Sequence, residues 1–309
     1  MKKTNQTEKQ SDRKTQWAIL LQSLGVFLLA YLFVYLLSGL SVLYIAYDLD
    51  IPARLFGNRI EFGITETNPL WTGDAIVSVF MSKPVSSFIM ATISILMLLL
   101  LKPKKFWIQL FYIWVFLHGF NFTFGLLSED LLLQRGLFRV ANVMDIRQIA
   151  LTLTIGISIF FLLKAGSLAG KLYFSKVFQL KPENKNTQLI NFQYTFLIPF
   201  FVGSLLVLIL NFNATKPKDF LLIASMFLSL IPIIFTKTAI LKTSNFTAQP
   251  ILSTAFILIS IALTTLIFFY LVLKFSHQTL KNSRMFRINR EYGYLIFSSQ
   301  FGNKFSSNY

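Results

Sequence analysis

The polar residues that could do chemistry in this 309-residue chain begin with a histidine and an asparagine inside a strongly apolar segment. His118, Asn121 and Gly125 stand at positions i, i+3 and i+7, so a helix would place them on one face. Polar groups are costly against lipid and normally face the interior of a helical bundle. The simplest interpretation is hydrogen bonding between helices. A proton relay or ligand site is the alternative, because histidine titrates near neutral pH.

A second group of polar residues follows in the segment 128–147, where acids and bases alternate with apolar residues. The residues that we single out there are Glu129, Asp130, Arg135, Arg139, Asn142 and Asp145. The pattern is typical of a helix that lies at the level of the lipid headgroups, with its charges solvated. Alternatively, Arg135 and Arg139, four residues apart, would contact lipid phosphates or a partner carboxylate. A membrane enzyme acting at the interface through these charges is a further hypothesis.

Composition excludes several kinds of chemistry. The chain has no Cys and only two His, so thiol nucleophiles, thiolate zinc sites and iron–sulfur clusters are excluded. Neither an H-E-x-x-H zinc helix nor a Walker A loop is present. We therefore expect no catalytic residue, metal site or cofactor. The net charge of +16 needs no nucleic acid to explain it, because Lys and Arg that flank membrane spans produce the same excess.

Long apolar runs predict the fold class. Hydrophobic residues make up 54% of the chain and charged residues only 14%, a balance that no water-soluble fold could cover. A helix needs about 20 apolar residues to cross a bilayer. The runs that fit are 17–47, 85–101, 106–127, 148–170, 190–212, 220–236 and 251–273. The sequence therefore predicts an all-α, polytopic transmembrane bundle of about seven spans, with six or eight as alternatives.

The segments outside these runs predict the topology. The basic tail 1–16 and other Lys-rich connections on its side indicate a cytoplasmic N-terminus. One transmembrane domain over 17–273 would then carry an extracytoplasmic loop at 48–84 and the interfacial segment 128–147. Within the loop, residues 59–64 alternate like a short strand, and 74–81 form an amphipathic approach ended by Lys83-Pro84.

The tail 274–309 is also basic, and its Arg284, Arg287 and Arg290 are expected to contact anionic lipid or a partner. Seven crossings would place this tail outside the cell, whereas six or eight would place it in the cytoplasm. The positive-inside rule favours the cytoplasm for so many bases, so the number of crossings stays open.

Residues 117–125 (LHGFNFTFG) and 136–142 (GLFRVAN) resemble segments of bacterial polytopic membrane proteins. The first segment is also similar to the motif helix of site-2-protease-type intramembrane metalloproteases. His118 matches the first histidine of their H-E-x-x-H motif, but Gly119 replaces the Glu and Phe122 replaces the second His. The departure removes a zinc ligand and the general base. The resemblance therefore implies an inactive relative and not a peptidase.

Taken together, these features favour a non-catalytic accessory or assembly subunit of a membrane complex in the bacterial inner membrane. Its expected contacts are bilayer lipids and a protein partner. Two alternatives stay open: a small-molecule or lipid transporter that uses the face of His118 and Asn121, and a degenerate intramembrane-protease-like protein.

Overall fold

The structure is a computed structural model, and it describes residues 2–56, 59–101, 103–174, 190, 192–210, 217–235, 254 and 256–265. Contacts divide the chain into two units, Met1–Leu266 and Ile267–Tyr309. The second unit lies outside the described residues, and so does the predicted tail 274–309 with Arg284, Arg287 and Arg290. Everything described below belongs to the first unit.

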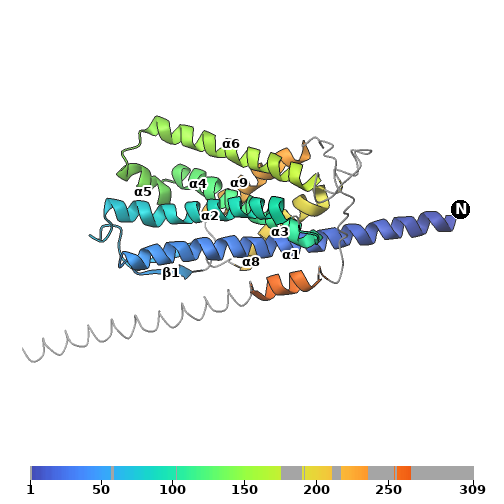
Figure 1. Cartoon of the computed structure of the whole chain (residues 1–309). Coiled ribbons are helices and arrows are strands. Elements are labelled where there is room, and N and C mark those ends of the chain that lie inside the picture. Colours follow the sequence, from blue (N-terminus) through green and yellow to red (C-terminus); the bar gives the residue numbers. More distant parts are fainter. Residues whose placement is uncertain are drawn as a thin grey trace, which may run out of the picture. The chain divides into compact units, whose positions relative to one another are not determined.

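The described chain is predominantly helical, which confirms the predicted all-α class. The α-helices are α1 (Lys2–Asp48), α2 (Gly73–Leu101), α3 (Phe106–Phe120), α4 (Leu126–Leu132), α5 (Gly136–Val143), α6 (Gln148–Leu172), α8 (Ile198–Leu210), α9 (Pro217–Ile234) and a further helix at Phe256–Thr265. The π-helical turns η1 (Asn121–Gly125) and η3 (Gln193–Leu197) precede α4 and α8. The helices α1, α2, α3 and α6 lie lengthwise beside one another (Figure 1).

Four of the described helices are long and apolar enough to cross a membrane. They are Gln16–Asp48, Gly73–Leu101, Phe106–Leu132 and Gln148–Leu172, and they match the first four predicted runs. The last three predicted runs correspond to shorter apolar helices at Gln193–Ile209, Phe220–Ile234 and Phe256–Thr265. The total of about seven spans therefore stays a prediction.

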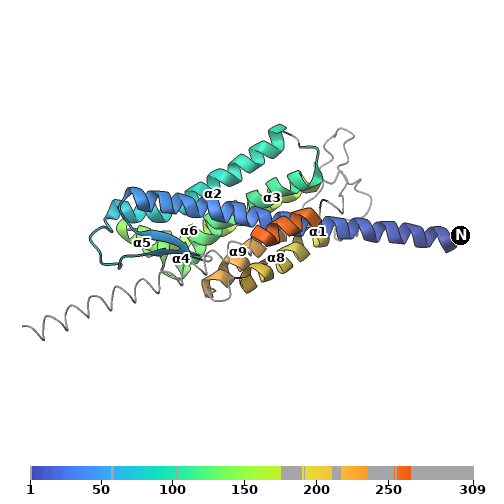
Figure 2. The same cartoon turned by 90° about the horizontal axis from the view of Figure 1, so that it is seen from below.

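Small residues allow the helices to approach closely. A Cβ added to Gly119 of α3 would lie 2.7 Å from the carbonyl oxygen of Ser87 in α2. A Cβ on Gly166 of α6 would overlap the carbonyl oxygen of Ser229 in α9. Small residues at such positions bring helix backbones into direct contact. The same packing places α8 against α1 (Figure 2) and α9 against α6.

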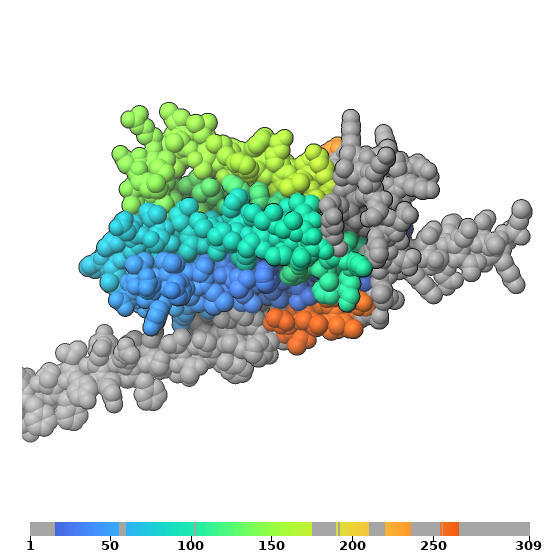
Figure 3. Space-filling model, in the orientation of Figure 1, coloured from blue at the N-terminus to red at the C-terminus, as the bar shows by residue number. Residues whose placement is uncertain are grey.

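The outward faces of α2 and α6 are apolar. Figure 3 shows the face of the molecule on which α6 lies above α2, α3 and α1. The exposed side chains include Ile89 and Ile93 of α2 and Leu153 and Ile157 of α6. Such a surface is unusual for a protein surrounded by water and typical of one surrounded by lipid.

A β-hairpin connects α1 to α2. Strands β1 (Ala53–Phe56) and β2 (Arg59–Phe62) are antiparallel, which confirms the strand predicted near 59–64. Arg54 and Glu61 stand opposite each other in the register and form an ion pair of 2.6 Å. Ile60 and Phe62 pack against a buried cluster formed by the end of α1 and the start of α2. The hairpin is thus seated on the adjoining ends of these two helices.

The start of α2 differs from the prediction. The helix begins at Gly73 and continues through Lys83-Pro84, so the prediction that these two residues end the preceding segment is wrong. Residues 73–84 of the predicted loop are therefore helical. Proline removes one backbone hydrogen bond, but a packed helix tolerates this loss because neighbouring helices compensate for it. Separately, the hydroxyl of Thr123 donates to the carbonyl oxygen of Pro84 at 3.0 Å and so joins η1 to α2 at this point.

Candidate functional site

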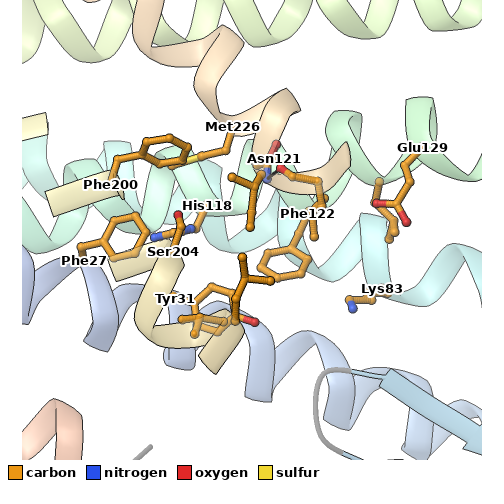
Figure 4. Close-up of a pocket in the computed structure, with 15 residues that line it drawn as sticks. Phe27, Tyr31, Lys83, His118, Asn121, Phe122, Glu129, Phe200, Ser204 and Met226 are labelled. Atoms are coloured by element: carbon orange, nitrogen blue, oxygen red, sulfur yellow. Dashed lines mark hydrogen bonds between the residues drawn. The ribbon is translucent and has the colours of Figure 1, made fainter. Parts of the chain in front are cut away.

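A cavity of about 80 Å³ lies between the helices (Figure 4). It is lined by residues from α1, α2, the continuous stretch α3–η1–α4, α8 and α9. These residues are Phe27, Tyr31, Lys83, His118, Asn121, Phe122, Leu126, Glu129, Phe200, Ser204, Val207, Leu208, Leu222, Ile223 and Met226. Most are apolar. The polar groups converge from different elements, as in a site that orients a ligand.

His118 lies near the middle of the apolar stretch Phe106–Leu132, and only 3% of its surface is exposed. Its imidazole ring is hydrogen-bonded to the backbone of Phe27, and the rings of these two residues are 4.7 Å apart. Nε2 of His118 has no hydrogen-bond partner among the residues that the structure describes. One side of the ring is therefore held by α1, and the other nitrogen keeps hydrogen-bonding capacity at a cavity wall.

Asn121 opens the π-helical turn η1 and joins it to α9. Its Nδ2 donates to the carbonyl oxygen of Leu222 at 2.9 Å, and its Oδ1 accepts from the hydroxyl of Ser225 at 2.7 Å. Gly125 leaves room for this contact, because a Cβ there would collide with the Asn121 side chain and with Oγ of Ser225. The amide of Asn121 is thus engaged in hydrogen bonds between elements.

The π-helical turn itself was not predicted. The expected spacing of His118, Asn121 and Gly125 was that of a regular α-helix, whereas η1 runs from Asn121 to Gly125. Such turns occur mostly as single-turn insertions in helices and often at functional sites. Nothing in the apolar pattern distinguishes this turn from an α-helix, so sequence alone could not have located it.

Glu129 lines the same cavity, which the sequence interpretation missed. It was assigned to the solvated, interfacial segment 128–147, but only 3% of its surface is exposed. One signal could have found it. Glu129 stands four residues after Gly125, and so extends the stripe of His118 and Asn121 by a further helical turn.

Lys83 is a second ionisable residue in the cavity lining. Its Nζ lies 4.8 Å from the centre of the Phe122 ring and 5.5 Å from that of Tyr35. Contact with aromatic faces stabilises an ammonium group away from bulk water. In Figure 4, Lys83 and Glu129 lie toward one end of the cavity and His118 and Phe200 toward the other. The ionisable side chains of Lys83 and Glu129 therefore lie at one end of the cavity, and the other end is mainly apolar and aromatic.

A buried hydrogen-bond network lies next to the apolar end. Nε1 of Trp114 donates to Oγ of Ser23 at 3.0 Å, and the Ser23 hydroxyl donates to the carbonyl oxygen of Thr195. The hydroxyls of Thr195 and Tyr173 are 2.7 Å apart. Trp114 and Ser23 stand four residues before His118 and Phe27, so the network is one helical turn nearer the N-terminal ends of α1 and α3. It holds four segments together there.

The remaining residues of the segment 128–147 lie outside the cavity lining. The carboxylate of Asp130 accepts a hydrogen bond from the backbone N–H of Leu137 at 3.0 Å, near the start of α5. Asp130 is half-buried. Arg135, Asn142 and Asp145 are exposed.

Arg139 is used within the chain. Its guanidinium group lies 5.2 Å from the ring centre of Trp71 and 5.4 Å from that of Phe80, and one nitrogen is 3.9 Å from the Glu66 carboxylate. We call Arg139, Trp71, Phe80 and Glu66 the α5 corner. The structure thus brings His118, Asn121 and Glu129 to one cavity, and holds Arg139 elsewhere.

No group of three or more His, Cys, Asp or Glu able to hold a metal ion occurs in the part of the chain that the structure describes. No protein-family model, curated protein or solved structure matches the chain. Its function must therefore be argued from the cavity.

Proposed function

We propose that this chain is an integral membrane protein that binds a small lipid-like molecule in the cavity and moves it within or out of the bilayer. The cavity is the observation that supports this proposal. It combines a mainly apolar and aromatic lining with a few polar side chains from different helices, as in a site that binds and orients a lipid-like molecule.

The helices support a membrane location. Four of them have the length and apolarity to cross a bilayer, and the outward faces of α2 and α6 present large apolar side chains. The excess of Lys and Arg on the side of the N-terminus favours a cytoplasmic N-terminus, and the resemblance of residues 117–125 and 136–142 favours the bacterial inner membrane. The hairpin of β1 and β2 would then lie on the extracytoplasmic side.

The cavity changes the ranking of the hypotheses that the sequence left open. An accessory or assembly subunit acts through its surface and has no need of a cavity with buried polar groups. A degenerate intramembrane protease explains His118 but not the convergence of Lys83 and Glu129 on the same space. The transporter hypothesis accounts for all three residues.

Native mass spectrometry of the full-length protein, released from mild detergent, tests the proposal. We expect the wild-type protein to retain a small lipid-like molecule and Ser204→Trp to lose it, because indole would fill the cavity. Leu205→Trp is the matched control, since residue 205 is adjacent on α8 but 57% exposed. A wild-type protein that carries no small molecule but a stoichiometric protein partner would instead favour the accessory subunit.

The absence of cysteine allows a second test in intact membranes. Ser204→Cys would place a single thiol at the cavity wall, and Leu205→Cys would place one on the outer face of α8. We expect a small methanethiosulfonate cation to react at least about tenfold faster at position 204, because thiolate formation needs a polar environment. Equal rates at the two positions would contradict an accessible cavity.

A further inference from the structure

The hydrogen bonds of His118 indicate which hydrogen-bonding group a ligand in the cavity needs. A neutral imidazole has one N–H donor and one acceptor nitrogen. Phe27 lies within helix α1, where its N–H is used by the helix but its carbonyl oxygen keeps a second lone pair, so the ring N–H donates to this oxygen. Nε2 is then an acceptor, and no described residue donates to it.

The surroundings of Nε2 make an unsatisfied acceptor costly. The rings of Phe27, Tyr31 and Trp114 have centres within 4.7, 5.7 and 5.9 Å of the imidazole centre. Buried polar atoms in folded proteins are nearly always hydrogen-bonded, and a buried acceptor without a donor destabilises the state that contains it. His118 is also among the residues that line the cavity, which brings its imidazole ring to a molecule bound there.

We propose that the ligand carries a hydroxyl group that donates a hydrogen bond to Nε2 of His118, so that the cavity takes an apolar alcohol or phenol. This inference rests on the proposed function and narrows its ligand class. Ethers, ketones and quinones offer only acceptors and would leave Nε2 unsatisfied. An ammonium group could donate, but its charge is costly near the centre of an apolar span. A hydroxyl group donates without charge.

Two matched pairs of probes test this class on the full-length, detergent-solubilised protein. The first pair is 1-dodecanol and its methyl ether, and the second is 4-nonylphenol and its methyl ether. Each ether keeps the apolar body but cannot donate. Native mass spectrometry at graded probe concentrations measures the four dissociation constants.

We expect the hydroxyl compound of at least one pair to bind about tenfold more tightly than its ether, the ratio that one hydrogen bond of ordinary net strength produces. A preference confined to the dodecanol pair would identify a chain alcohol, and one confined to the nonylphenol pair a ring hydroxyl. His118→Phe should bind both compounds of a pair equally. His118→Gln should retain part of the preference, because its amide oxygen accepts.

Ser158→Ala is the control, because Ser158 is a buried polar residue of α6 that does not line the cavity and its replacement should leave the preference unchanged. If the wild-type protein binds all four probes without preference, the hydroxyl inference fails and the proposed function stands. If it binds none of them, the proposed function fails as well. A preference that persists in His118→Phe would show that another residue accepts the hydrogen bond.

Discussion

The cavity and the α5 corner both contain buried or half-buried polar side chains, but these side chains differ in what they contact. In the α5 corner, Arg139 lies against the rings of Trp71 and Phe80 and approaches Glu66, so its charge is used within the chain. At the cavity, Nε2 of His118 has no partner among the described residues. Polar groups that contact other groups of the chain stabilise the fold. A polar group of the cavity wall that has an unused hydrogen-bond acceptor can instead bind a ligand.

The largest expected loss of stability comes from a substitution that separates two of the helices packed around the cavity. Gly166→Leu would force a side chain against the carbonyl oxygen of Ser229 and separate α6 from α9, which supplies Leu222, Ile223 and Met226 to the cavity. Backbone cannot move aside cheaply, so we expect a loss of about 3 kcal/mol or more. Fluorescence-detected size-exclusion chromatography of the solubilised protein would show little folded material.

Gly156→Leu provides the matched control for that experiment. Gly156 lies on the same helix, and a Cβ there would meet nothing within 4 Å. We expect a normal elution profile. If both variants are equally well folded, the close approach of α6 and α9 is not a requirement of the fold.

An intermediate loss of stability is expected for a polar residue of the cavity that already makes hydrogen bonds within the chain. Asn121→Leu removes the hydrogen bonds to Leu222 and Ser225 that join η1 to α9. We expect unfolding of the detergent-solubilised protein to become easier by about 2 kcal/mol, because the Ser225 hydroxyl loses a buried partner. Thermal and denaturant unfolding monitored by tryptophan fluorescence measure the change.

Asn142→Leu is the comparison for Asn121→Leu, because Asn142 is an exposed asparagine of α5. Its replacement should change stability very little. Equal losses from the two variants would mean that the contacts of Asn121 contribute nothing beyond the change of residue type.

The smallest effect is expected in the α5 corner. Arg139→Ala removes the contacts with Trp71 and Phe80, and we expect a loss of about 1 kcal/mol in unfolding free energy. Binding of dodecanol or nonylphenol should be unchanged, since Arg139 is not among the residues that line the cavity. Arg135→Ala, four residues earlier and exposed, should alter neither quantity. A loss of probe binding in Arg139→Ala would show that the two regions are coupled.

The sequence predicted local features well. Apolar runs located the four long helices, and alternation at 59–64 located a strand, because both patterns follow from neighbours along the chain. The same local logic failed at Lys83-Pro84, which ends a helix in many sequences but lies inside α2. Helix α2 packs against α3 and η1, and these contacts keep it helical through Pro84.

The sequence by itself determined which segments are apolar helices and that thiol chemistry is absent, because hydrophobicity, length and composition are properties of the chain alone. Only the tertiary structure decided which residues share a cavity. His118, Lys83 and Glu129 meet Phe200 and Met226 because α8 and α9 return to the first helices after a long stretch of chain. Contacts of that kind depend on helix packing and on single glycines, and neither leaves a periodic pattern in the sequence.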